Sequence, residues 1–190
     1  MIVATITINL QGIDNAAALL ADPTPLLQAG GEGIETRLRK HFLERDAEGN
    51  KKGWPRKHFW NRVVRQATSL GEVTADRATV HIASPEFGLH LRGGTVTPKR
   101  GKFLAIPITA EAYKAGSPRE GNMPGLFFVR FPKGNRAYLS TQDGPQYRLL
   151  KSVTIPADPR ALPPEGDLVE AARVPVESMI NRAIRRSRAA

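Results

Sequence analysis

Apolar positions recur along this chain with two periods, and the change from one to the other separates strands from helices. Residues 2–10 alternate β-branched side chains with Thr and Ala, which is typical of a strand, and residues 13–28 are rich in Ala and Leu and favour a helix that Pro23 and Pro25 end early. Later helices are expected at 34–45, opened by Gly30, Gly31 and Gly33, and at 58–70, 110–115 and from about Pro175 onward. Further strands are expected at 72–75, 79–83, 95–97, 102–107, 126–131 and 137–140, and residues 147–155 fit either a strand or a helical turn.

This order of elements predicts an α+β fold, in which an antiparallel β-sheet is packed by two or three helices and carries a long loop or hairpin. Residues 1–155 are expected to form a single domain, residues 156–167 a Pro-rich linker, and residues 168–190 a basic amphipathic helix. The apolar stripe of this helix falls at i, i+3, i+4, i+7 and i+8, on Val176, Met179, Ile180, Ala183 and Ile184. A stiff linker that ends in such a stripe predicts an arm that reaches a neighbouring subunit.

Charge is the strongest bulk signal. The chain of 190 residues holds 28 Lys and Arg against 18 Asp and Glu, a net charge of +10 that favours polyanions or acidic protein surfaces. Ten basic residues against three acidic ones lie between Arg37 and Arg65, on a helix and on the loop that holds Trp54. Solvated helix faces explain such clusters equally well.

The residues give little support to an enzyme. There is no Cys, which excludes disulfides, thiolate catalysis and zinc sites that use sulfur. The four His residues do not form metal-binding pairs with carboxylates on one helix, and neither a nucleophile elbow nor a P-loop occurs. No apolar run is long enough to span a membrane, so we expect a soluble protein made in the cytoplasm, without metal or cofactor.

The most distinctive segment surrounds a basic turn. It reads Gly93-Gly94-Thr95-Val96-Thr97-Pro98-Lys99-Arg100-Gly101-Lys102-Phe103-Leu104-Ala105-Ile106-Pro107. The glycine pair permits a tight bend and the cations precede an apolar strand, which predicts a hairpin with a cationic tip. Charges that protect a sheet edge from aggregation would give the same pattern.

This segment resembles the signature of the phage virion-morphogenesis proteins, the tail-completion or neck family of Mu-like and related tailed phages. Further similarities are the loop Gly53-Trp54-Pro55 before the helix that precedes the sheet, and the run Val153-Thr154-Ile155-Pro156-Ala157 before the last helix. The similarity covers roughly residues 30–185, and its specific part is the segment at 93–107. After Ala157 the chain has Asp158-Pro159-Arg160, where the family commonly has aromatic residues.

The resemblance implies a non-enzymatic virion protein. It implies a ring, expected to be hexameric, between head-closure or adaptor proteins and tail-terminator or tail-tube proteins, with genomic double-stranded DNA passing through the lumen. Cations that face the lumen would contact phosphate without reading sequence. The candidates for such contacts, or for contacts with acidic partner surfaces, are Arg37, Lys40, Arg56, Lys57, Lys99, Arg100 and Lys102.

Two other functions stay open. A free-standing basic nucleic-acid-binding protein is suggested by the net charge and by Trp54 and Trp60 among neighbouring cations. A small hydrolase or nuclease that uses His58 or His81 is a weaker alternative, because the acids are scattered.

Overall fold

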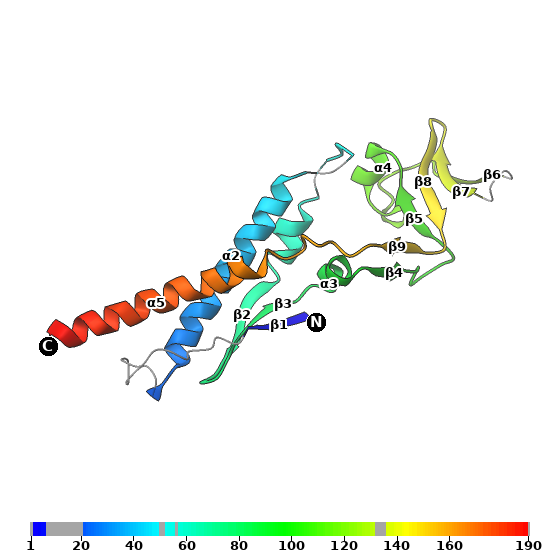
Figure 1. Ribbon diagram of the computed structural model, residues 1–190. Coiled ribbons are helices and arrows are strands. Elements are labelled where there is room, and N and C mark those ends of the chain that lie inside the picture. The colour runs from blue at the N-terminus through cyan, green and yellow to red at the C-terminus, as the bar shows by residue number, and fades with distance from the viewer. Residues whose placement is uncertain (1, 7–20, 50–51, 56, 132–135, 190) are drawn as a thin grey trace. The chain divides into compact units, whose positions relative to one another are not determined.

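The computed structural model describes residues 2–6, 21–49, 52–55, 57–131 and 136–189 and shows an α+β fold (Figure 1). Its elements are β1 (Ile2–Ile6), α2 (Thr24–Ala47), the π-helix η1 (Phe59–Val64), β2 (Thr68–Val73), β3 (Ala78–Ile82), α3 (Pro85–Arg92), β4 (Gly94–Val96), β5 (Leu104–Pro107), α4 (Ala110–Ala115), the 3-10 helix η2 (Pro118–Glu120), β6 (Phe127–Phe131), β7 (Arg136–Thr141), β8 (Gly144–Leu150), β9 (Val153–Ile155) and α5 (Glu165–Ala189). The mixed fold with antiparallel strands and a C-terminal helix was predicted, but the strands form three sheets instead of one.

The chain forms two compact units. Unit 1 comprises residues 1–48, 58–91 and 158–190, and unit 2 comprises residues 49–57 and 92–157. This division differs from the expected single domain over 1–155, because the last segment packs with the first and a long insertion forms a unit of its own.

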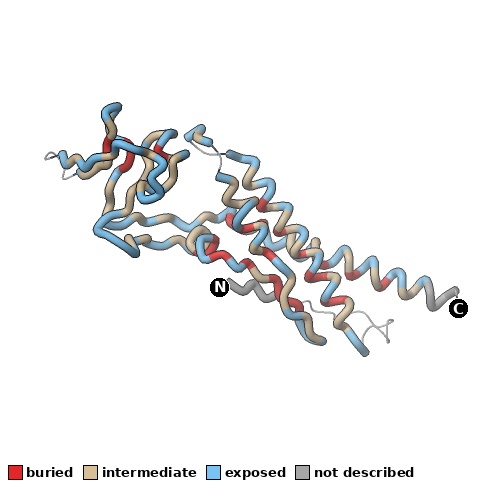
Figure 2. The backbone as a smooth tube through the Cα atoms, turned by 180° about the vertical axis from the view of Figure 1, so that it is seen from behind, coloured by how far each residue is buried: buried red, intermediate tan, exposed pale blue. Residues whose placement is uncertain are grey.

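Unit 1 is a three-stranded antiparallel sheet covered by α2. The strand order is β1-β3-β2, so the β-branched start of the chain pairs with β3. The buried face of α2 consists of Leu26, Leu27, Gly30, Gly31, Ile34, Leu38 and Phe42. Phe42 stacks on Trp60, and Phe87 of α3 meets Phe42 edge to face. Most of the buried residues in Figure 2 belong to this unit.

The glycines of α2 lie inside the helix and do not open it. The helix starts at Thr24, where Asp22 accepts the Thr24 N–H and Pro25 occupies the first turn, both of which are helix-start signals. Gly33 faces α5 so closely that a Cβ there would lie 2.0 Å from the carbonyl oxygen of Ala171. The glycines therefore permit close packing, and the expected break near residue 30 is wrong.

α5 begins at Glu165, three residues before the helix expected at 168–190 and ten before the start expected near Pro175, and this proline lies in its interior. Val176 and Ile180 are buried against Leu26 of α2, and Met179 and Ile184 pack on the same cluster. Ala183 is half-buried on this side. The predicted amphipathic stripe is present, but the chain uses it to hold its own helices together, so these five residues do not form a free arm for a neighbouring subunit.

The segment expected to be a linker is fixed to unit 1 from Asp158 onward. The Asp158 carboxylate lies 2.5 Å from the Arg45 guanidinium, and the Asp158 N–H donates to the carbonyl of His90. Ala161 is fully buried in the main core of unit 1. The prolines thus shape a packed connection into α5.

The helix expected at 58–70 is shorter and of another type. His58 enters it with a left-handed φ of 53°, and the Asp46 carboxylate accepts the N–H of Asn61. The π-helix ends at Val64, whose carbonyl accepts the Thr68 hydroxyl, and β2 starts at that threonine. The β-branched Thr68 and the sheet pairing with β3 override the helical apolar pattern.

Unit 2 contains a four-stranded antiparallel sheet, β5-β8-β7-β6, and a two-stranded ribbon, β4-β9. The segment at 93–107 is therefore not a hairpin, because β4 pairs with β9 and β5 pairs with β8. Gly93 has a φ of +70°, and a Cβ there would lie 2.7 Å from the nitrogen of Ala157, so glycine allows the two ends of the ribbon to approach. The cationic turn joins the ribbon to the sheet. Among the described residues, no helix is long and apolar enough to cross a membrane.

Candidate functional site

The short helix α4 is fixed to the sheet of unit 2 by buried polar groups. The Thr109 hydroxyl caps α4 by accepting the N–H of Ala112, and it donates to the side-chain oxygen of Gln146 at 2.6 Å. The Gln146 side-chain amide donates in turn to Thr141 on β7. This chain of hydrogen bonds fixes the start of α4 against the β7–β8 hairpin.

Tyr147 anchors the other end of α4. Its ring is fully buried, and its hydroxyl lies 3.1 Å from the carbonyl oxygen of Ala112 and 3.0 Å from that of Gly116. Burial raises the pKa of the Tyr147 phenol, and the charge of Glu120 adds to this effect. The phenol therefore stays a neutral donor to the helix C-terminus at any ordinary pH.

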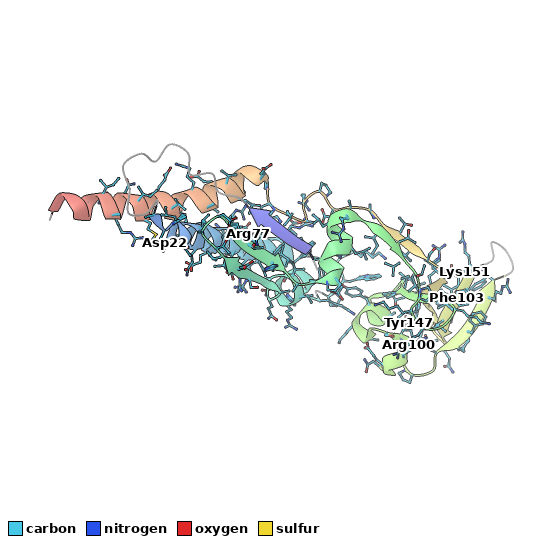
Figure 3. All side chains as sticks on the ribbon, turned by 90° about the horizontal axis from the view of Figure 1, so that it is seen from below. Asp22, Arg77, Arg100, Phe103, Tyr147 and Lys151 are labelled. Atoms are coloured by element: carbon cyan, nitrogen blue, oxygen red, sulfur yellow. The ribbon has the colours of Figure 1, made fainter. Side chains whose placement is uncertain are left out.

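A basic cleft of about 890 Å³ opens beside α4. Its wall is formed by the cationic turn, by β5, by the segment after α4 and by Lys57; the cations among its lining residues are Lys57, Lys99, Arg100 and Arg119, and the one acid is Glu120. Arg119 donates to the carbonyl oxygen of Arg100 at 2.7 Å, which holds the turn against η2. Figure 3 labels Arg100 and Phe103, which line the cleft, and Tyr147 of the same unit. Four cations against one carboxylate make this cleft, which we call the basic cleft, a site for an anion.

Aromatic rings support one end of the basic cleft. Trp54 packs on Tyr113 of α4 with ring centroids 5.2 Å apart. The ammonium group of Lys57 lies 4.8 Å from the centroid of the Tyr113 ring, and that of Lys52 lies 4.2 Å from that of Trp54. These cation–π contacts hold the two lysines beside the aromatic rings.

The predicted contact residues are divided between the two units. Lys57, Lys99 and Arg100, which are far apart in sequence, line the basic cleft together, and Lys102 is exposed on the same turn. Arg37 forms ion pairs within unit 1, at 2.6 Å with Asp167 and at 3.6 Å with Glu44. Lys40 is 70% exposed on α2, with Glu44 at 3.9 Å, and Arg56 lies outside the described residues.

The two units differ strongly in charge. Unit 2 contains 15 Lys and Arg against 3 Asp and Glu, a net charge of +12, and unit 1 contains 13 against 15, a net charge of −2. The whole basic excess of the chain therefore belongs to the unit that holds the basic cleft. A charge distribution of this kind is typical of surfaces that contact phosphate.

Of the two histidines proposed for catalysis, His58 has a structural partner, whereas the buried Nδ1 of His81 has no hydrogen-bond partner among the described residues. His58 lies 2.7 Å from Asp46, whose second oxygen accepts a backbone N–H of the π-helix, so this pair fixes the start of η1. His81 lies half-buried on β3. Within the described part of the chain, no group of three or more His, Asp or Glu side chains could hold a metal ion.

Comparisons with protein-family models, with curated proteins and with solved structures find no match for this chain. The resemblance to the phage neck family therefore stays a prediction from the segment at 93–107.

Sequence analysis missed two parts of this unit. Arg119 and Tyr113 complete the basic cleft, but nothing in the pattern places them beside a turn that lies before them in the chain. The exposed aromatic rings of β6 could have been predicted. In a strand, Phe127 and Phe128 point to opposite faces, so aromatic rings lie on both faces, whereas a strand with one face in water usually has polar side chains on that face.

Proposed function

We propose that this chain is a structural protein of the neck of a tailed phage, and not an enzyme. About six copies would form a ring between the head-closure or adaptor proteins and the tail-terminator or tail-tube proteins, around the channel through which the genomic DNA passes. The concentration of cations in unit 2, which holds the basic cleft, is the observation that carries the proposal. The resemblance of the segment at 93–107 provides the biological setting.

The chemistry of the basic cleft suits passing DNA. Lysine and arginine contact phosphate at every step of a duplex, so affinity depends on charge and on salt but not on sequence. Four cations line the cleft and can contact phosphate, and the lining contains none of the Asn and Gln side chains that read adenine in the major groove. We therefore expect weak binding of double-stranded DNA that is uniform between sequences.

The decisive experiment removes the protein from a phage that encodes it. A nonsense mutation in its gene should give filled heads and complete tails that do not join, and the chain supplied from a plasmid should restore joined particles seen by electron microscopy. Native mass spectrometry of the neck isolated from wild-type particles should then give about six copies of the 20.8 kDa chain. Joined and infectious particles in its absence would refute the proposal.

The basic cleft is tested by charge reversal. The double variant Lys99→Glu with Arg100→Glu should weaken DNA binding and lower the slope of log K against log salt by about 0.9 for each phosphate that the protein no longer neutralises. The matched control is Arg62→Glu with Arg77→Glu, which makes the same charge change on exposed residues of unit 1. Equally weakened binding in both variants would assign the affinity to net charge alone.

A free-standing nucleic-acid-binding protein is the second candidate. The rings of Trp54 and Tyr113 with lysines over them favour it, because such pairs also stack bases. This function predicts tight DNA binding by a protein that is absent from purified particles, whereas a neck protein remains with the particles and retains DNA weakly.

A further inference from the structure

β6 is the end strand of the four-stranded sheet. It is hydrogen-bonded to β7, and within the described residues no other strand lies beside it, so one row of its backbone N–H and C=O groups faces outward (Figure 1). Its three phenylalanines are exposed: Phe127 by 49%, Phe128 by 57% and Phe131 by 45%. An edge strand that exposes apolar side chains is a template for pairing with another chain.

The register with β7 assigns these rings to faces. Phe127, Val129 and Phe131 lie on one face of the sheet, which we call the aromatic face, and Phe128 lies on the other. Tyr138 of β7 is opposite Val129, and its ring meets that of Phe131 edge to face at 5.5 Å.

Unit 2 has little core of its own to compensate for this exposure. Both clusters of buried apolar residues belong to unit 1, and the buried hydrophobic residues described in unit 2 are Ala112 and Tyr147, at the α4 end of the sheet. In Figure 2 the β6–β7 region is almost entirely exposed or half-buried. Several exposed aromatic rings on one strand are unusual for a surface that faces water alone and mark an interaction site.

The sequence of β6 is self-complementary. It reads Phe-Phe-Val-Arg-Phe, so a second copy that runs antiparallel and is centred on Val129 places Phe127 opposite Phe131 and Phe128 opposite Arg130. Centring on Arg130 instead would put two guanidinium groups directly opposite each other, which is unfavourable. Antiparallel pairing also continues the pattern of the sheet, in which every neighbouring pair is antiparallel.

We propose that β6 pairs with β6 of a second copy of this chain, antiparallel and centred on Val129, to give a dimer with a continuous eight-stranded sheet. The contact is isologous, because the same strand serves both copies. On the aromatic face, Tyr138 and Phe131 of one copy form a continuous row with Phe127 of the other. Cross-strand aromatic pairs of this kind are among the stabilising pairs of antiparallel sheets.

A second copy of this chain fits the exposed edge of β6 better than a nucleic acid does. Arg136 and Arg148 belong to the same face of the sheet as Phe131 and Tyr138, and so would favour a polyanion there. They lie on β7 and β8, however, and pairing at β6 satisfies the backbone edge, which a nucleic acid does not. The dimer does not rest on the proposed phage function: it concerns the isolated chain, whereas the neck proposal is tested in particles.

Disulfide trapping tests the register, since the chain contains no Cys. In an antiparallel pair, residues that face each other have Cα atoms about 4.5–5.5 Å apart, within disulfide range. Val129 would face its own copy, so Val129→Cys should form a disulfide-linked dimer under mild oxidation. Phe127→Cys or Phe131→Cys alone should not, because the two copies of each position would be about 13 Å apart. An equal mixture of these two variants should cross-link.

Sedimentation velocity of the unmodified chain completes the test. We expect a reversible dimer, and Phe127→Lys should raise its dissociation constant at least about tenfold by placing a charge against Phe131 in both halves. Circular dichroism of each variant under reducing conditions checks that the fold is kept. A monomeric chain at high concentration, or cross-linking of Phe127→Cys alone as readily as Val129→Cys, would overturn the proposal. Monomers that bind single-stranded nucleic acid through Phe127 would assign the face to that ligand instead.

Discussion

The contact between α2 and α5 should not tolerate a single methyl group at Gly33. A Cβ there would lie 2.0 Å from the Ala171 carbonyl oxygen and 3.0 Å from Pro175 Cγ, and the oxygen belongs to helix backbone that cannot turn away. The helices must separate by about 1 Å or more, which loosens the cluster of Leu26, Val176 and Ile180.

The magnitude follows from two opposing effects. Overpacking against backbone costs about 3 kcal/mol, at the upper end of the usual range, and alanine in a helix interior is favoured over glycine by about 1 kcal/mol. Gly33→Ala should therefore destabilise unit 1 by about 2 kcal/mol, which lowers its melting temperature by about 4–8 °C in a chain of this size.

Urea and thermal unfolding should be followed by the fluorescence of Trp60, which packs in the core of unit 1, in a Trp54→Phe background that silences unit 2. The matched control is Gly166→Ala near the start of α5, where an added Cβ meets nothing within 4 Å and stability should stay the same or rise slightly. If Gly33→Ala were as stable as the unchanged chain, the close packing of the two helices would be refuted.

Three further changes test the polar interior. Tyr147→Phe should lower the stability of unit 2 by about 1 kcal/mol, because two helix carbonyls lose their hydroxyl donor. The pKa of Tyr147 is raised in the folded chain, so the free energy of unfolding of the unchanged chain should decrease as pH rises above about 10, where the unfolded chain loses the phenol proton first. Urea titrations at pH 9–11 should show that this decrease is smaller in the variant. Burial, helped by the charges of Arg37 and Arg45, lowers the pKa of His41. The free energy of unfolding should therefore decrease as pH falls below about 6.5, because the unfolded chain then binds a proton that the folded chain does not. If the stability of a His41→Gln variant decreased as steeply with pH, His41 would be excluded as the cause. Arg45→Met should cost about 3 kcal/mol by leaving Asp158 without its nearest charge partner, and a loss below about 1 kcal/mol in urea unfolding would show that this ion pair is unimportant.

Local pattern located several strands and failed where distant residues decide. β2 begins at Thr68, four residues before the strand expected at 72–75, and residues 147–155 fitted either a strand or a helical turn. Period-two alternation placed β3, β5, β6 and β7 to within about two residues, because each strand has its own turn signals. The pairing of β4 with β9 joins residues about sixty positions apart, and no local pattern contains that information, so a turn between two sheets was interpreted as a hairpin. The prediction that glycines open a helix at residue 30 failed for the same reason. A glycine that opens a helix and a glycine that lets a neighbouring helix approach look the same in the sequence.

The role of Pro175 in α5 was ambiguous in the sequence in the same way. Pro175 is an ordinary first residue of a helix, but here the helix begins at Glu165 and the proline lies inside it. The candidate site was predicted in part: Lys99 and Arg100 were found as a cationic turn, whereas their meeting with Lys57 and Arg119 depends on how α4 is fixed by Thr109, Gln146 and Tyr147.

The order in which the two units share the chain has a consequence for biosynthesis. Unit 1 is built from the first, a middle and the last segment, so the chain passes between units at residues 48, 57, 91 and 157. While the ribosome is still translating the insertion, α2 has emerged with Leu26 uncovered, because its cover on α5 is made last. Unit 1 can complete this packing only after α5 has emerged from the ribosome, so a chaperone that shields apolar helices would engage this protein through α2.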